Sequence, residues 1–184
     1  MMTFDDLLAA ARQNPENTDF AALRLAYTQS PGYAPYERDS ETRAALQKAL
    51  EEDDLQAART AVDQLLAHNY LNIDAHMTAA HLYRRLDDLA SVDYHRQFGH
   101  GLLKSIFRSG DGTSFDTAWV VIAVAEEYAV CMALGDVETE SQRLVEHEDH
   151  RFDVLTVRHP RTQETRELTF NVDLPMDWAE RHYE

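Results

Sequence analysis

The densest cluster of side chains that could hold a metal ion reads His-Glu-Asp-His, over residues 147–150. A zinc site needs ligands that converge, such as two histidines one helical turn apart. His147 and His150 are instead three residues apart, in a segment expected to be a loop before a strand, and no third ligand can be identified. We therefore expect no metal at this cluster and predict no cofactor.

Asp111, Glu126 and Glu127 are the second group with possible chemistry, because paired carboxylates can divide the acid and base roles of a reaction. The three could gather at one end of a sheet. Alternatively, Asp111 caps its own turn and the two glutamates end a strand in water. The chain has no glycine-rich phosphate loop and no nucleophile elbow, and its single cysteine, Cys131, lies in an apolar context typical of a core residue.

An internal repeat suggests a different kind of site. Asp53-Asp54-Leu55 recurs as Asp87-Asp88-Leu89, 34 residues further on, which is the tetratricopeptide period. Small or apolar residues coincide in the same register, although Leu65 and Gly99 agree poorly, and coincidence in a helical chain rich in Ala, Leu and Asp is the alternative. The repeat predicts helices over 40–51, 54–68, 74–86 and 88–107.

In tetratricopeptide pairs the first helix of each repeat lines a groove. The predicted groove residues are Arg43, Gln47, Glu51, Asp74, Met77, His81, Arg84 and Arg85. Three arginines on one surface of an acidic chain would reverse the local sign of charge and could hold an acidic peptide by bidentate contacts. Alternatively, the first two helices fill the groove and the arginines pair with acidic residues at its rim.

The elements before the repeat are two short helices and a stiff loop. Thr3 can cap a helix whose first turn carries Asp5 and Asp6, and a second helix is expected from residue 18 or 19 to Tyr27. The loop over 30–36 contains two prolines and two tyrosines. The two tyrosines can pin the loop against neighbouring helices. As the alternative, we predict that Tyr33 and Tyr36 are exposed and contribute to binding a partner.

From residue 101 onward the pattern changes from helical to extended. After a turn at Gly110-Asp111-Gly112, residues 118–125 form an apolar run that favours a buried strand, and residues 126–134 fit either a strand or a short helix. The polar segment 136–149 is expected to be a connector. Alternation over 152–157 and 166–172 predicts a hairpin, after which Trp178 folds back onto the core.

These elements predict an α+β fold, with a helical bundle packed on a small antiparallel sheet. We expect a helical subdomain over 1–108 and a β-rich subdomain over 109–184 that share a core. The 184 residues include 33 acidic and 17 basic side chains, for a net charge of −16. An acidic field of this size disfavours binding to nucleic acid or anionic membranes and favours a basic partner. No segment has the pattern of a signal peptide or a membrane span, so we expect a cytoplasmic protein.

An ordered set of motifs resembles the bacterial family called domain of unknown function 4919. The motifs are Asp19-Phe20, Leu23-Arg24, Tyr27, Pro31, Tyr33, Pro35-Tyr36, Gly101-Leu102-Leu103, Ser109-Gly110-Asp111-Gly112, Glu126-Glu127-Tyr128, Phe170-Asn171-Val172-Asp173 and Pro175. The resemblance covers most of the chain, implies an α+β protein with tetratricopeptide-like helices, and implies no activity.

Two functions are consistent with these patterns. The first is a non-enzymatic protein-binding module, such as a small inhibitor or immunity protein against a basic partner. The second is a small hydrolase or metal-dependent enzyme that uses carboxylates and histidines near the sheet. A pocket with convergent carboxylates and a strongly perturbed pKa would favour the enzyme, whereas a broad convex or grooved surface without such a pocket would favour the binding module.

Overall fold

The computed structural model describes residues 2–36, 39–135 and 137–183. Helices and a four-stranded sheet make up the chain, and the predicted α+β class is confirmed. Contacts divide the chain into two compact units. The first contains the described residues up to Leu23 and from Asp39 to Leu102, and the second contains Arg24–Tyr36 and the described residues from Leu103 to Tyr183.

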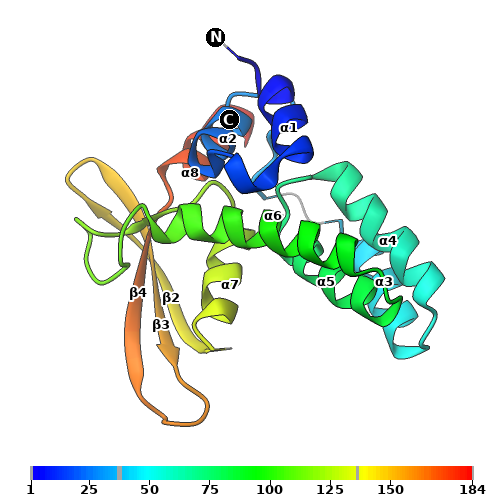
Figure 1. Cartoon of the computed structure of the whole chain (residues 1–184). Helices are drawn as coiled ribbons and strands as arrows, with labels where there is room; N and C mark the ends of the chain where they lie inside the picture. Colours follow the sequence, from blue (N-terminus) through cyan, green and yellow to red (C-terminus); the bar gives the residue numbers. More distant parts are fainter. Residues whose placement is uncertain (1, 37–38, 136, 184) are drawn as a thin grey trace. The chain divides into compact units, whose positions relative to one another are not determined.

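The first unit is helical. Its elements are α1 (Phe4–Gln13), η1 (Pro15–Asn17), the start of α2 (Phe20–Tyr27), α3 (Ser40–Glu51), α4 (Leu55–His68), α5 (Ile73–Arg85) and most of α6 (Leu89–Phe107). Thr3 and Asp6 form the expected capping box of α1. The four helices predicted between 40 and 107 are confirmed to within two residues at each end (Figure 1).

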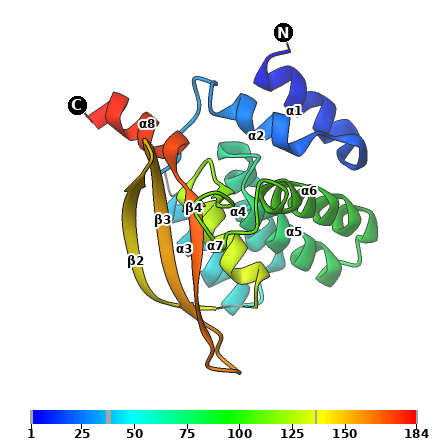
Figure 2. The ribbon, with the colours of Figure 1, turned by 90° about the vertical axis from the view of Figure 1, so that its left-hand side faces the viewer.

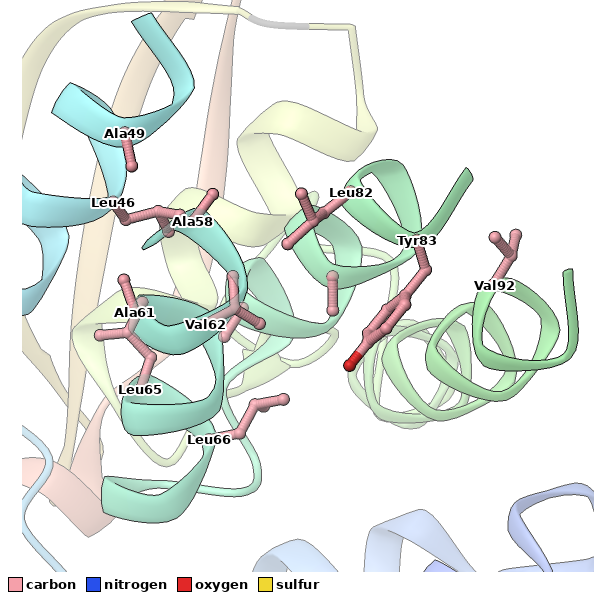
Figure 3. Close-up of a cluster of buried hydrophobic side chains, with 12 residues drawn as sticks. Leu46, Ala49, Ala58, Ala61, Val62, Leu65, Leu66, Leu82, Tyr83 and Val92 are labelled. Carbon is pink, nitrogen blue, oxygen red and sulfur yellow. The ribbon is translucent and has the colours of Figure 1, made fainter. Parts of the chain in front are cut away.

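A core of small and apolar side chains holds α3, α4, α5 and α6 together. Leu46, Ala58, Val62, Leu82 and Val92 are all buried in it, and Figure 3 shows these side chains directed into the space between the helices. Ala58 and Val92 are 34 residues apart and are almost completely buried, at 0% and 2% exposure. The small side chain of Ala58 therefore marks the close helix contact that the repeat predicts.

The second unit contains the sheet, in the order β1-β4-β3-β2. Its strands are β1 (Trp119–Val120), β2 (Glu138–His147), β3 (His150–Arg158) and β4 (Thr165–Asn171), with α7 (Val124–Ala133) and α8 (Asp173–Tyr183). The predicted hairpin is confirmed as the antiparallel pair β3–β4, and β2 pairs antiparallel with β3 (Figure 2). The sheet is mixed, because β1 runs parallel to β4, whereas an antiparallel sheet was expected.

Two extended segments differ from the sequence-based predictions. The predicted strand over 118–125 is wrong beyond β1, because Val124 begins α7. Just before this helix, the Ile122 N–H donates to the Glu126 carboxylate at 2.9 Å instead of to a neighbouring strand. Residues 126–134, which fitted a strand or a helix, thus belong mainly to α7. The predicted connector 136–149 is largely the edge strand β2, apart from Asp136, which lies outside the described residues. Almost every β2 side chain is exposed, so its sequence lacks the alternation of a half-buried strand.

Candidate protein-binding face

The two helix hairpins, α3–α4 and α5–α6, close with the same turn 34 residues apart. Asp53 and Asp87 both have positive φ, at 60° and 57°. The Asp54 N–H donates to Ala49 O at 2.9 Å, and the equivalent Asp88 N–H donates to Tyr83 O at 3.0 Å. The recurring Asp-Asp-Leu sequence therefore encodes a recurring structure, since aspartate tolerates the left-handed conformation that each turn needs.

Ion pairs link α3 and α5 at both ends. Arg43, near the start of α3, contacts Asp74 near the start of α5 at 2.9 Å. Arg85, the last residue of α5, pairs with Asp53, which follows α3. The start of α3 pairs with the start of α5, and the residue after the end of α3 pairs with the end of α5. The two helices therefore run parallel. They present their outward side chains on one surface, which we call the α3–α5 face.

The α3–α5 face exposes a stripe of α5 side chains at positions i, i+4 and i+7. Met77 is 38% exposed, and His81 and Arg84 are also exposed. On α3, Gln47 is exposed and its amide donates to Glu51 Oε1 at 2.9 Å. The side chain of Arg84 forms no ion pair with any residue that the structure describes. The stripe therefore has an apolar side chain at one end and a free guanidinium group at the other.

The structure corrects the predicted local reversal of charge at this face. Of its three arginines, Arg43 and Arg85 are each neutralised by an aspartate, so only Arg84 is left to bind an external anion. Both pairs are partly exposed and contribute little to stability. The packing of α3, α4, α5 and α6 around their shared core positions the helices instead.

Tyr33 and Tyr36 belong to the second unit, and the prediction that both are exposed is wrong. Tyr33 is only 4% exposed, and its hydroxyl donates to Ile122 O at 2.6 Å. Tyr36 is half-buried, with its ring centroid 6.1 Å from that of Trp178. The Trp178 side chain does fold back onto the loop, and both tyrosines are structural there.

The carboxylates of Asp111, Glu126 and Glu127 do not form one site. Asp111 is exposed and accepts hydrogen bonds from Thr113 and Thr117, as expected for a residue that caps its own turn. Glu126 is buried in a bidentate ion pair with Arg24, with Nε–Oε1 at 2.8 Å and Nη2–Oε2 at 2.5 Å. The prediction that the two glutamates end a strand in water is wrong.

Glu127 forms a buried carboxyl pair that sequence analysis did not identify. The side chain, on α7, is 2% exposed and interacts with Asp153 on β3. Burial and the nearby Asp153 charge raise the pKa of Glu127 to about 9. Burial also raises the pKa of Asp153, whose Oδ2 accepts a hydrogen bond from the Gln142 amide. At neutral pH Glu127 therefore keeps its proton in the folded chain.

We expect Glu127→Gln to stabilise the protein at alkaline pH. In the unfolded chain Glu127 ionises near its ordinary pKa, whereas in the folded chain it keeps a proton until about pH 9. The stability that protonated Glu127 allows is therefore complete below about pH 4.5 and is lost as pH rises toward 9. Glutamine removes this loss.

The measurement is the thermal midpoint of Glu127→Gln and wild type between pH 5 and pH 9. The variant should melt higher at pH 8 by at least about 2–4 °C, the shift that 1 kcal/mol produces in a protein of this size. The advantage should shrink toward pH 5. Glu146→Gln, at an exposed position of β2, is the control and should follow wild type at every pH. A constant difference across the pH range would contradict a raised pKa of Glu127.

No metal site forms around His147 and His150. They pair with each other across a tight turn, in which Glu148 and Asp149 both have positive φ. His150 Nδ1 lies 2.7 Å from Asp173 Oδ2, and His147 stacks on Phe115. Within residues 2–36, 39–135 and 137–183, no group of three or more His, Cys, Asp or Glu side chains could hold a metal ion.

Another buried histidine, His76, is part of the first unit's core. Its Nε2 lies 2.9 Å from Tyr70 O, a group that can only accept, so Nε2 carries the proton. Nδ1 is then the acceptor for His95 Nδ1, 3.0 Å away. Burial lowers the pKa of His76 to about 4, so the ring is neutral and serves as a structural hydrogen-bonding group. Cys131 is likewise buried, as predicted, and burial raises its pKa.

Comparison with known proteins agrees with the resemblance seen in the sequence. The family model described as Domain of unknown function (DUF4919) matches residues 5–181. The chain belongs to this family. The DUF4919 match includes both compact units and thus the whole α3–α5 face. No curated protein and no solved structure matches the chain. In the part of this DUF4919 protein that the structure describes, no helix is both long enough and apolar enough to span a bilayer.

Proposed function

We propose that this chain is a protein-binding module that takes a segment of its partner against the α3–α5 face. The observation that carries the proposal is the exposed stripe of Met77, His81 and Arg84 on a helix that runs parallel to α3. An apolar side chain and a free guanidinium on the same helix offer both contact area and a directed anion contact. Both helices are anchored in one buried core, which limits the ordering cost of binding.

The proposal includes a tetratricopeptide-like architecture for the two hairpins. The 34-residue spacing and the shared turn support it, and so does the parallel arrangement of α3 and α5. In such repeats the first helices of successive hairpins line the binding surface. Arg43, Gln47, Met77, His81, Arg84 and Arg85 are the residues assigned to it.

The net charge of the chain favours one kind of partner. A net charge of −16 speeds encounter with a protein that is basic outside the docked segment and disfavours nucleic acid. We therefore include in the proposal a cytoplasmic inhibitor or immunity protein that binds such a partner. The docked segment itself is recognised at the α3–α5 face.

A hydrolase that uses Glu127 and Asp153 is the second candidate, because a raised carboxyl pKa is common in active sites. Against it, Glu127 is 2% and Asp153 8% exposed, so neither carboxyl group is open to a substrate in this structure. A general acid or base must come within hydrogen-bonding distance of the reacting group. The accessible α3–α5 face therefore has the better support.

The test is capture of a partner by the tagged chain from cells of its source, followed by binding measurements with the captured protein. Arg84→Glu should markedly reduce capture because it replaces the free guanidinium with a repelling charge. Arg161→Glu is the matched control, with the same charge change at an exposed position of the β3–β4 turn. Arg85→Glu is unsuitable because it would also place a second acid beside Asp53. Equal capture by the two variants would refute the proposed face.

A further inference from the structure

Helix α6 approaches the α3–α5 face so closely that only a glycine fits at residue 99 without a shift. A Cβ atom there would lie 3.1 Å from Met77 Sδ and 3.2 Å from His76 Cβ. In the repeat, Gly99 takes the place of Leu65, a buried side chain of the core. The poor agreement of the repeat at this position thus has a structural cause, which is the contact between α6 and Met77.

This contact places further cationic and polar groups beside Met77. Arg96 is three residues before Gly99 and four before His100, so the three are neighbours on the surface of α6. Arg96 and His100 are both exposed. Neither forms an ion pair with any other residue in the described part of the chain. With Met77, His81 and Arg84 they make up what we call the α5–α6 strip.

We propose that the α5–α6 strip binds an acidic segment of a partner protein, an inference that rests on the proposed function and specifies its ligand. Arg84 and Arg96 stay unpaired although acidic side chains outnumber basic ones 33 to 17 in the chain. Their guanidinium groups bind carboxylates in a bidentate manner, and the two imidazoles add hydrogen-bonding groups. Met77 takes an apolar side chain of the same segment.

A short acidic peptide suits this surface better than nucleic acid. The strip is small, so a segment with a few carboxylates can be neutralised locally. A continuous polyanion would extend beyond the strip into the field of the acidic chain, which repels it. The strip is thus expected to discriminate by the number and spacing of negative charges.

The experiment measures fluorescence anisotropy with a labelled peptide of alternating Glu and Leu that ends in a free carboxylate. The full-length chain should bind this peptide and should not bind the same peptide with Gln in place of Glu. Arg96→Glu should weaken binding about tenfold or more, as expected for loss of a charge-assisted hydrogen bond. Arg161→Glu, the matched control, should bind as wild type does.

Three results would overturn this inference. They are absence of binding to the acidic peptide, equal binding of the Gln peptide, and tighter binding of single-stranded DNA than of the acidic peptide. Partner capture separates the inference from the proposed function on which it rests. If Arg84→Glu markedly reduces capture and Arg96→Glu does not, the α3–α5 face stands and the α5–α6 strip fails.

Discussion

Arg24→Met should destabilise the protein by about 3–5 kcal/mol, the cost typical of breaking a buried ion pair by removal of one partner. Arg24 is 4% exposed and Glu126 5%. Besides its bidentate contact with Glu126, the guanidinium donates to Val120 O at 2.9 Å and to Ser105 Oγ at 3.3 Å. The variant would leave the Glu126 carboxylate buried without its cation. It would also leave Val120 O without this donor.

Thermal unfolding measures the effect, and a drop of about 10 °C or more is expected for this loss in a chain of this length. The double variant Arg24→Met/Glu126→Gln should recover part of it. It removes the unpaired charge and keeps an amide oxygen as acceptor for the Ile122 N–H. The ion pair would not hold α2 and α7 in place if the single variant had the melting temperature of wild type. The same conclusion would follow if the double variant were less stable than the single one.

Val121→Asp should also unfold or severely destabilise the second unit. Val121 is completely buried, at 0% exposure, and its N–H donates to Asn171 O at 3.2 Å just beyond the end of β1. Aspartate would place a carboxylate there without a cation or a set of donors, at a cost of several kcal/mol, on the order of the whole stability of a marginal domain.

Ala125→Asp is the control for this variant because it adds the same side chain at an exposed position in the first turn of α7. An acidic residue is favourable near a helix N-terminus, so the control should keep the wild-type midpoint. The readouts are the soluble yield and the melting temperature of each variant. A soluble Val121→Asp protein that melts with wild type would mean that Val121 is not in the core.

The helices between residues 40 and 107 could be predicted closely because their starts are marked locally. Asp39, Asp54 and Asn72 each accept a hydrogen bond from a backbone N–H in the first turn of α3, α4 and α5. The two Asp-Asp-Leu turns mark the ends of α3 and α5. Caps and turns depend on a few adjacent residues, so the sequence alone identifies them.

The sheet was harder to predict because its signals depend on partners far away in the chain. β2 is an exposed edge strand without an apolar face, and only its pairing with β3 makes it a strand. β1 contributes two residues whose parallel partner is β4, about fifty positions later. An apolar run such as 118–125 does not by itself reveal that Val124 begins a helix.

The candidate sites, too, could be predicted only where they do not depend on contacts between residues far apart in the sequence. The exposed positions Gln47, Met77, His81 and Arg84 follow from helical periodicity and the repeat. Periodicity does not reveal that aspartates in other elements neutralise Arg43 and Arg85. It also does not reveal that Glu127 is buried close to Asp153. Arg96 and His100 could have been found from the glycine that replaces Leu65 in the repeat. That departure marks a close approach of two helices.

The most direct test of the proposed function is the affinity of the captured partner for wild type, Arg84→Glu and Arg161→Glu under identical salt conditions. Both substitutions change the net charge equally, so a difference in affinity between the two variants is due to where the substituted residue lies. We predict that Arg84→Glu weakens binding about tenfold or more, while Arg161→Glu stays close to wild type and all three proteins melt together. Equal affinities for Arg84→Glu and Arg161→Glu would contradict binding through the α3–α5 face.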